Sequence, residues 1–405
     1  MNYMNIIADE RLVREAITRA VEKIYPSRDA LERELMSGRR LRIYHGVDPT
    51  GIHLHIGHLT NLLTLRRLQV LGHEIIFLIG DFTARIGDPT DKLAARKPLS
   101  AEEVRANFTT FKKQASRVIK FSGENKARVA FNAKWLAKMN LEDAFQLAGY
   151  FTVQQMMQRD MFQERLRADK PISLNEFFYP LLQGYDSVAL DVDMEIGGND
   201  QTFNMLVGRD LLRILKRKEK FVLTTKLLQH PVTGKKLMNK SEGGLVNLDD
   251  VPTEMFGRIM ALDDAAIDPL AEYSTNLPME EVEALKALAA SKPRDAKLKV
   301  AEAVVTTVSN RAAARRARQE FLAIFTEKQK PEDIREVSVG VSEMNIVELV
   351  FAVQLAPSKS EARRLVEQGA VRIDDVKKTD LTEVIALAKQ RIIQVGPRRF
   401  LRISQ

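Results

Sequence analysis

Two histidines three positions apart are the clearest candidates for chemistry in this sequence. The chain has six histidines, and His55 and His58 flank Gly57 directly before an apolar run with helical spacing. This spacing predicts imidazoles in the first turn of a helix, where free N–H groups and the helix dipole favour an anion. Gly57 would let a flat ligand approach the backbone. The pair indicates a phosphate site, although a histidine pair can also bind zinc.

Zinc receives little support from the rest of the sequence. The chain has no cysteine, which excludes disulfides and thiolate metal sites. No glutamate adjoins the histidine pair as a metalloprotease motif would require. Asp191 and Asp193 resemble metal ligands, but they alternate with apolar residues, so we expect them on an exposed strand edge. We expect no metal bound by the protein itself.

A polar triplet on a helix forms the second candidate site. Tyr179, Gln183 and Asp186 are spaced by four and three residues, which places their side chains on one helix face. Ser173 and Glu176 predict a capping box that opens this helix, and Pro180 predicts a kink. Apolar neighbours favour a mostly buried helix, so the triplet indicates the polar wall of a pocket.

Glycine-rich segments provide three more candidates. The segment 80–90 (GDFTARIGDPT) follows a predicted strand and is, taken alone, typical of a structural turn. The segment 196–201 (IGGNDQ) follows an apparent strand at Leu190–Met194, and Asp200 there could accept hydrogen bonds from ribose hydroxyls. The segment 234–244 (GKKLMNKSEGG) could fold over a polyphosphate, because lysine ammonium groups suit transient phosphate contacts.

The elements that must position these residues alternate between strands and helices. Leu41–Val47 and Glu74–Ile79 read as strands, 57–71 as a helix, and Ser100–Ile119 as a helix opened by a Ser100/Glu103 capping box. Alternation of this kind predicts an α/β fold with a Rossmann-like, doubly wound parallel sheet. Ligands of such sheets bind beyond the carboxyl ends of the strands, where the histidine motif falls.

Size and composition limit the remaining possibilities. A chain of 405 residues suggests two or three domains. No apolar stretch is long enough to span a bilayer, so we expect no membrane association. The N-terminus lacks a signal-peptide core, and the absence of cysteine fits a reducing cytoplasm. The net charge of +8 favours a polyanionic partner.

The pattern changes along the second half of the chain. We predict a catalytic domain over 1–225, a lysine-rich connection over 226–252, an all-α domain over 253–326, a charged linker over 327–343, and a small basic α+β module over 344–405. The last 65 residues hold 11 basic and 8 acidic side chains. Binding of phosphates there would therefore depend on charges gathered on one face.

In this order the motifs resemble those of the class I aminoacyl-tRNA synthetases, and more narrowly of the bacterial tyrosyl-tRNA synthetase family. The matching segments are His55–His58, Lys236–Ser241, the pattern Tyr44-x-Gly46-x-Asp48-Pro49-Thr50, Tyr179 with Gln183 and Asp186, and Gly197–Gln201. The run 358–369 (SKSEARRLVEQG) resembles an S4 RNA-binding domain. The resemblance covers nearly the whole chain.

The resemblance implies a role for each matching residue. Tyr44 and Asp186 would hold the phenol hydroxyl of L-tyrosine, while Tyr179, Gln183, Asp88 and Gln201 would surround its α-ammonium group. ATP would contact Gly46, Asp48, Gly57, Gly198, Asp200, Lys236, Lys240 and Ser241. Thr50, His55, His58 and Lys240 would act on the phosphates during catalysis, with Mg²⁺ carried by ATP.

The resemblance also implies partners. Residues 253–326 would bind the tRNA(Tyr) anticodon, Lys359, Arg363 and Arg364 would contact RNA, and the enzyme would be a homodimer. The lysine loop departs from the family signature Lys-Met-Ser-Lys-Ser, because Leu237 takes the place of the first lysine and Asn239 that of the first serine. Lys235 or Lys236 would then supply the missing charge.

Tyrosine–tRNA ligation is therefore the predicted function, and three rivals can be weighed against it. A tryptophan-specific synthetase would have no use for Tyr44 and Asp186, because indole has no hydroxyl group. A non-catalytic RNA-binding protein on the same scaffold is supported only by the altered lysine loop. A small nucleotidyltransferase would leave the helical and S4-like segments without a role.

Overall fold

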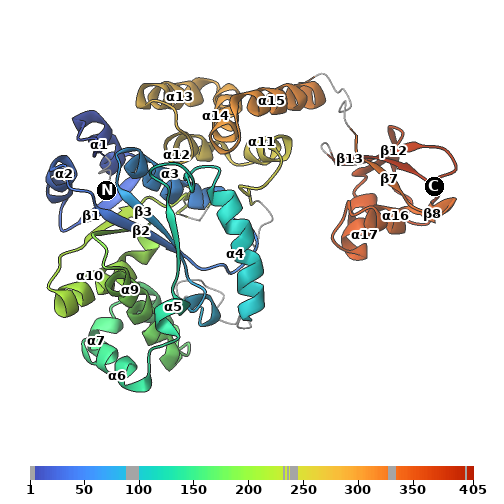
Figure 1. Cartoon of the computed structure of the whole chain (residues 1–405). Helices are drawn as coiled ribbons and strands as arrows, with labels where there is room; N and C mark the ends of the chain where they lie inside the picture. Colours follow the sequence, from blue (N-terminus) through green and yellow to red (C-terminus); the bar gives the residue numbers. More distant parts are fainter. Residues whose placement is uncertain are drawn as a thin grey trace. The chain divides into compact units, whose positions relative to one another are not determined.

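The computed structural model describes residues 5–87, 100–230, 233–234, 237, 245–326, 334–396 and 399–405. The chain forms two compact units, residues 1–311 and 312–405 (Figure 1). The finer division into five segments stays a prediction. No described helix combines the length and apolar character needed to cross a bilayer.

A six-stranded sheet forms the centre of the first unit, as far as the structure describes it, in the order β1-β6-β5-β2-β3-β4. Its strands are β1 Val21–Tyr25, β2 Arg42–Val47, β3 Glu74–Ile79, β4 Arg128–Phe131, β5 Met194–Gly198 and β6 Phe221–Thr225. Neighbouring strands are parallel except that β1 is antiparallel to β6 at the edge. The predicted α/β class with a parallel sheet is confirmed.

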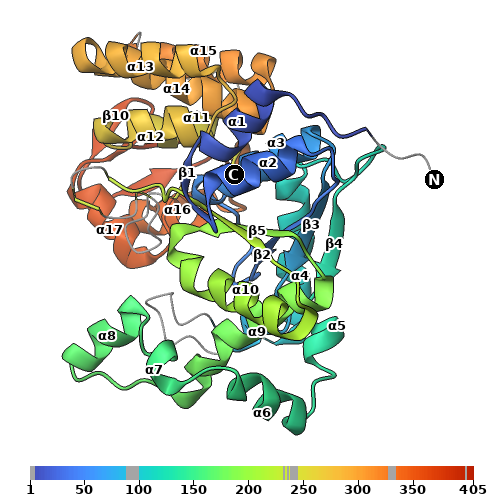
Figure 2. The same cartoon turned by 90° about the vertical axis from the view of Figure 1, so that its left-hand side faces the viewer.

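Helices cover both faces of this sheet. Its helices are α1 Glu10–Thr18, α2 Arg28–Met36, α3 Ile56–Val70, α4 Ala101–Ala115, α5 Ala133–Leu136, α6 Leu141–Gly149, α7 Val153–Met156, α8 Asp160–Arg167, α9 Phe178–Leu190 and α10 Thr202–Lys216. From β2 the chain passes through α3 to β3 and then to β4 on one side of β2. It crosses back through α9 to β5 on the other side of β2 and continues through α10 to β6. Right-handed crossovers then place α3 opposite α9 and α10, as Figures 1 and 2 show.

The predicted strand at Leu190–Met194 is wrong. Val188 and Leu190 are buried on α9, so their apolar pattern continues the helix rather than starting a strand. Asp191 ends α9 in the left-handed conformation, with φ 50°. The strand β5 begins only at Met194, so Gly197 and Gly198 are its last two residues, at the end of the strand beside the cavity.

Two smaller expectations need correction, and the kink at Pro180 stays a prediction. Pro180 lies in the first turn of α9, where a missing N–H costs no helical hydrogen bond. The Ser173/Glu176 capping box forms, but it opens the short 3-10 helix η2 (Leu174–Phe177) before α9. Asp193 is not on an exposed edge: it is buried and accepts the Arg42 N–H at 2.7 Å and an Arg39 N–H at 3.0 Å.

Residues 252–326 are mostly helical, in line with the prediction for 253–326, and most of this region belongs to the first unit. Its helices are α11 Pro252–Met260, the 3-10 helix η5 Asp264–Ala266, α12 Ile267–Tyr273, α13 Met279–Ser291, α14 Pro293–Val308 and α15 Arg311–Thr326. The helix α14 packs against α11, α12 and α13. Buried Arg19 fixes this region to the end of α1, since it donates to the carbonyls of Glu272, Thr275 and Leu277.

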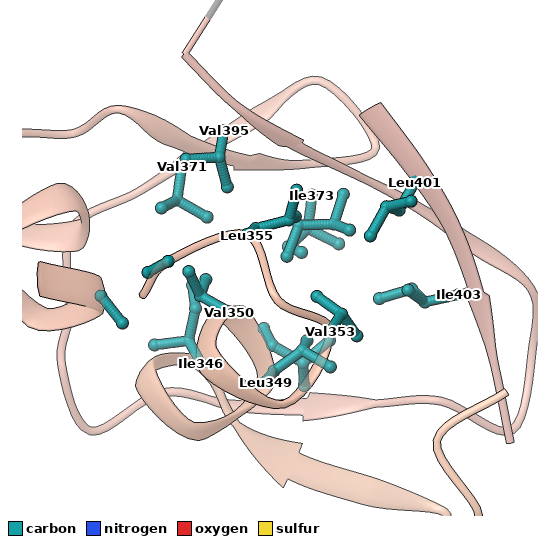
Figure 3. Packing of buried hydrophobic residues seen from close by; sticks show 14 of the residues in the cluster. Ile346, Leu349, Val350, Val353, Leu355, Val371, Ile373, Val395, Leu401 and Ile403 are labelled. Carbon is teal, nitrogen blue, oxygen red and sulfur yellow. The ribbon is translucent and has the colours of Figure 1, made fainter. Parts of the chain in front are cut away.

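The second unit contains a small α+β fold. Its elements are β7 Glu336–Ser338, β8 Glu343–Asn345, α16 Ile346–Ala352, α17 Lys359–Glu367, β9 Val371–Ile373, β10 Val376–Lys378, β11 Val384–Ala386, β12 Arg391–Val395 and β13 Arg399–Ser404. Aliphatic side chains from α16, β9, β12 and β13 meet in one core (Figure 3). Val337, Val339 and Met344 also pack against this core, which holds the two helices against the strands.

Close packing of α9 on α10 supports the face that carries Tyr179, Gln183 and Asp186. A Cβ atom at Gly184 would lie 2.9 Å from Val207 Cγ1 and 3.1 Å from the Gly208 backbone nitrogen. We predict that Gly184→Ala lowers the free energy of unfolding by about 1–3 kcal/mol through overpacking. Gly149→Ala, where nothing lies within 4 Å of the new atom, is the control in chemical denaturation. Equal stability of both variants would contradict this packing.

Candidate active site

A cavity of about 410 Å³ opens at the carboxyl ends of β2 and β5. The chain reverses its direction across the sheet between these two strands, which is where doubly wound sheets bind ligands. The cavity brings together most of the predicted site residues: Tyr44, Gly46, Asp48, Thr50, His55, Gly57, His58, Tyr179, Gln183, Asp186, Gly198, Asp200 and Gln201. Asp88, Lys236, Lys240 and Ser241 lie outside the described residues.

The two histidines lie at the start of helix α3, as predicted, and both take part in capping it. His55 is the N-cap residue, and its Nδ1 accepts the Gly57 N–H at 3.1 Å, while His58 Nδ1 accepts the His55 N–H at 3.1 Å. A nitrogen that accepts carries no proton, so each neutral ring holds its proton on Nε2. The centroids of the two imidazole rings lie 4.1 Å apart. The pair thus offers N–H donors beside a helix N-terminus, which suits an anion.

Gly57 has a steric role that the motif alone did not indicate. A Cβ atom there would lie 2.9 Å from both Cε1 and Nδ1 of His55. Any side chain would push the His55 ring away from its capping position. The glycine is therefore required by the histidine as much as by an approaching ligand.

A buried polar network joins the two ends of the cavity. Asp48 accepts hydrogen bonds from the Thr83 hydroxyl at 2.7 Å and the Tyr179 hydroxyl at 2.8 Å. The Asn132 amide donates both to Thr83 at 3.1 Å and to Asp186 at 3.2 Å. The carboxylates of Asp48 and Asp186 are thus fixed by one set of side chains.

Asp186 is held as a buried hydrogen-bond acceptor. Its side chain is 3 % exposed and accepts the Trp135 indole N–H at 2.7 Å as well as the Asn132 amide. Burial raises the pKa of Asp186 well above its usual range, and the two donors oppose that rise. Among the described residues the Tyr44 hydroxyl forms no hydrogen bond with Asp186; it lies 2.9 Å from Ser187 Oγ.

The polar wall of α9 continues into α10. Gln183 accepts an amide N–H of Asn204 at 2.9 Å and donates to Glu195 at 3.2 Å. The same Asn204 amide group donates to Gln201 at 2.9 Å. Gln183 and Gln201, which the sequence assigned to one subsite, are therefore positioned by a common partner.

Sequence reasoning missed several residues of the site. Asn132 and Trp135 directly follow β4. Their place at the carboxyl end of a strand was the signal that could have identified them as site residues. Thr83 lies in the segment 80–90, which, taken alone, the sequence predicted to be a structural turn. His45 is buried, its Nδ1 donates to the Ile196 carbonyl at 2.8 Å, and its Nε2 has no partner among the described residues. Burial lowers the pKa of His45, so Nε2 is an acceptor at neutral pH.

The predicted RNA contacts lie in the second unit. Lys359, Arg363 and Arg364 are exposed on α17. Lys359 also pairs with Glu348 at 3.0 Å and Arg364 with Glu361 at 2.7 Å. Such surface pairs contribute little and can open for a phosphate. Across the described ranges, no three His, Asp or Glu side chains are grouped as a metal site would need; that the protein binds no metal stays a prediction.

Comparison with known proteins gives consistent matches over the whole chain. Residues 36–326 match the family described as tRNA synthetases class I (W and Y), and residues 327–394 match the tyrosine–tRNA ligase SYY-like C-terminal domain. The tyrosine–tRNA ligase of Carboxydothermus hydrogenoformans is 39% identical over 401 residues, covering 96% of this chain and 97% of that protein. The enzyme of Legionella pneumophila is 40% identical over 391 residues, covering 96% of each.

Solved structures agree on the fold. A C-terminally truncated mitochondrial tyrosyl-tRNA synthetase of Coccidioides posadasii superimposes with a TM-score of 0.60 at 25% identity, covering 76% of this chain and 90% of that one. A tyrosyl-tRNA synthetase of Archaeoglobus fulgidus, solved in complex with L-tyrosine, gives 0.61 at 22% identity, covering 76% of this chain and all of that one.

The position of Asp48 depends on a glycine in the next strand's turn. A Cβ atom at Gly80 would lie 1.9 Å from Asp48 Oδ1 and 2.3 Å from Thr83 Oγ1. We predict that Gly80→Ala separates these two groups and lowers the free energy of unfolding by about 1–3 kcal/mol. Gly46→Ala is the control in the same denaturation experiment, because its Cβ would meet only Leu78 Cδ2, at 3.8 Å. If both variants unfold alike, Gly80 does not position Asp48.

Proposed function

Because the chain belongs to the tyrosine–tRNA ligases, a family of class I aminoacyl-tRNA synthetases, we propose that this cavity joins L-tyrosine to ATP. The tyrosyl group would then pass from tyrosyl-adenylate to the 3′ end of tRNA(Tyr). The observation that carries the proposal is that the buried side chains of Tyr44 and Asp186 and the histidine cap of α3 line one cavity. A protein with this activity would work in the cytoplasm, where its substrates meet.

Tyr44 and Asp186 form the proposed phenol subsite. A phenol hydroxyl donates one hydrogen bond and accepts others, and the acceptor offered to it is the Asp186 carboxylate. Phenylalanine would bury its ring edge against both polar groups and offer neither the hydrogen bond that the phenol hydroxyl gives, which is costly. Indole would not match the pair either, so tryptophan is disfavoured on the same ground.

The α-ammonium group would lie between α9 and β2. Tyr179, Gln183 and Gln201 surround this part of the cavity, and Asp88 would add a carboxylate from outside the described residues. Tyr179 lines the cavity and donates its hydroxyl to Asp48, and its oxygen would accept a hydrogen bond from the ammonium group. The amino acid would then be held at both ends with its carboxylate toward the histidines.

ATP would occupy the rest of the cavity. Gly46, Asp48, Thr50 and Gly57 line one side and Gly198 and Asp200 the other. Asp200 would accept hydrogen bonds from the ribose hydroxyls, and the unpartnered Nε2 of His45 would accept another from the nucleoside. A Cβ atom at Gly198 would lie 2.6 Å from Asp200 Oδ1, so this glycine keeps the carboxylate in place.

The chemistry requires positioning rather than proton transfer. The tyrosine carboxylate attacks the α-phosphorus with its own charge, the new C–O–P bond forms, and the bond to pyrophosphate breaks. His55 and His58 would donate Nε2–H to phosphate oxygens as charge builds in the transition state. Lys236, Lys240 and Ser241 would hold the departing pyrophosphate, and ATP would bring Mg²⁺ on its own phosphates.

A homodimer is proposed from an apolar surface on the first unit. Large apolar side chains are exposed along α6, α7, α8 and the segment that follows: Leu141, Phe145, Tyr150, Val153, Leu166 and Leu174 are between 40% and 77% exposed. A monomer seldom leaves so many large apolar residues uncovered in one stretch of chain. A second copy of the chain would cover them.

The assignment of the phenol and phosphate subsites predicts different kinetic defects. In tyrosine-dependent exchange of pyrophosphate into ATP, Asp186→Ala should lose the use of tyrosine through a KM raised at least about a hundredfold. His58→Ala should lower kcat about a hundredfold with a modest change in tyrosine KM, because its contact forms mainly in the transition state. If none of the amino acids supports exchange, a non-catalytic protein is favoured.

The apolar surface predicts a change in assembly. Phe145→Glu should convert dimers to monomers, because a buried carboxylate without a partner opposes association. Sedimentation velocity measures the change. Val251→Glu, at an apolar residue 63% exposed elsewhere in the unit, should leave the dimer intact. A wild-type monomer, or equal behaviour of both variants, would exclude this interface.

The basic residues of α17 predict weaker RNA binding on charge reversal. Replacing Arg363 and Arg364 by Glu should raise the Kd for tRNA(Tyr) at least about tenfold and reduce its salt dependence, since phosphate contacts release counterions. Lys389→Glu changes an exposed lysine of the same unit and serves as the control in filter binding. An equal effect of both changes would mean that α17 has no special part in binding.

A further inference from the structure

A buried ion pair lies behind the proposed phenol subsite and has no part in the chemistry described so far. Lys220, directly before β6, is fully buried, and Glu195 on β5 is 2 % exposed. The Lys220 ammonium contacts the Glu195 carboxylate and donates to Ser187 Oγ at 2.8 Å. It lies 5.9 Å from the centroid of the Tyr44 ring. Glu195 is also the register partner of Tyr44 across β2 and β5.

The fold makes room for this ammonium group. A Cβ atom at Gly208 on α10 would lie 2.6 Å from Lys220 Nζ and 2.7 Å from Ser187 Oγ. Only a glycine leaves the space in which these two atoms meet. Burying two charges carries a large desolvation cost, and apolar replacements of similar size are often as stable. Stability alone is therefore a weak reason for this pair.

The donors and acceptors of the network give it a direction. A lysine ammonium only donates and a carboxylate only accepts. Ser187 Oγ receives a proton from Lys220, so its own proton points away from the ammonium, toward the Tyr44 oxygen at 2.9 Å or toward Glu195 at the longer 3.4 Å. The shorter contact favours donation to Tyr44. The Tyr44 proton then points away from Ser187, either to the Glu195 carboxylate within the protein or into the cavity that Tyr44 lines.

We propose that Lys220 and Glu195, acting through Ser187, are positioning residues that orient the Tyr44 hydroxyl as a donor to the phenol oxygen of the substrate. This inference rests on the proposed phenol subsite. Asp186 accepts the phenol proton and Tyr44 donates to the phenol oxygen, so the substrate hydroxyl is matched in both directions. Glu195 also accepts from Gln183 at 3.2 Å, which ties the same pair to the ammonium subsite.

The decisive variants change Ser187, which touches no substrate in this arrangement. Ser187→Ala should raise the tyrosine KM in pyrophosphate exchange about tenfold. The kcat, the ATP KM and the poor kcat/KM for phenylalanine should stay within about twofold. Ser187→Thr, which keeps the hydroxyl, should restore the tyrosine KM. An unchanged tyrosine KM, or an equal loss for tyrosine and phenylalanine, would overturn the proposal.

A double-mutant cycle tests the ion pair itself. Lys220→Met with Glu195→Gln removes both charges and keeps an acceptor for Gln183. This variant should raise the tyrosine KM to the same extent as Ser187→Ala, and adding Ser187→Ala should raise it no further. Additive effects would overturn the relay through Ser187. If the charge-free variant does not fold, as circular dichroism would show, the Ser187 pair of variants decides alone.

The outcomes distinguish a failure of this inference from a failure of the proposed function. Wild-type protein without tyrosine-dependent exchange would contradict the proposed function. An Asp186→Ala variant with unchanged tyrosine KM would contradict the placement of the phenol. Neither result depends on Ser187, so a failure of the relay alone leaves the function and the subsite standing.

Discussion

The rest of the site depends on one constraint, the cost of keeping the Asp186 carboxylate in a dry interior. A buried carboxylate needs donors, and here Trp135 and Asn132 provide them from the segment after β4. Asn132 also donates to the Thr83 hydroxyl, and Thr83 donates to Asp48, so the positions of these three side chains are linked. The turns after three parallel strands are thereby fixed relative to α9. The hydrogen bonds that satisfy one buried carboxylate thus fix the polar side chains along the cavity.

Small residues allow these polar groups to meet. Gly80 leaves room for Asp48, Gly57 for the His55 ring, and Gly208 for the Lys220 ammonium. At each of these positions a Cβ atom would lie closer to a polar side chain than contact distances permit. The backbone thus approaches the functional groups closely, and their geometry is set by packing before any ligand binds. Preorganisation of this kind is what transition-state stabilisation without proton transfer requires.

Much of this arrangement could be predicted from the sequence, and the failures have physical causes. Alternating apolar runs predicted the sheet, and the spacing of His55 and His58 predicted the cap of α3. Hydrogen-bond partners distant in sequence could not be predicted, so the contact of the Tyr44 hydroxyl with Ser187 was missed. The apolar run at Leu190 was misread as a strand because buried helices and strands share that pattern. Lys220 showed no local sign of burial.

The central claim is that the cavity recognises a phenol hydroxyl between Tyr44 and Asp186 while the histidine cap holds phosphates. A crystal structure of the protein with L-tyrosine and a non-hydrolysable ATP analogue tests it most directly. We expect the phenol oxygen within hydrogen-bond distance of both the Tyr44 hydroxyl and the Asp186 carboxylate, with the phosphates beside Nε2 of His55 and His58. A phenol oxygen bound away from Asp186, or phosphates away from the histidines, would contradict the account.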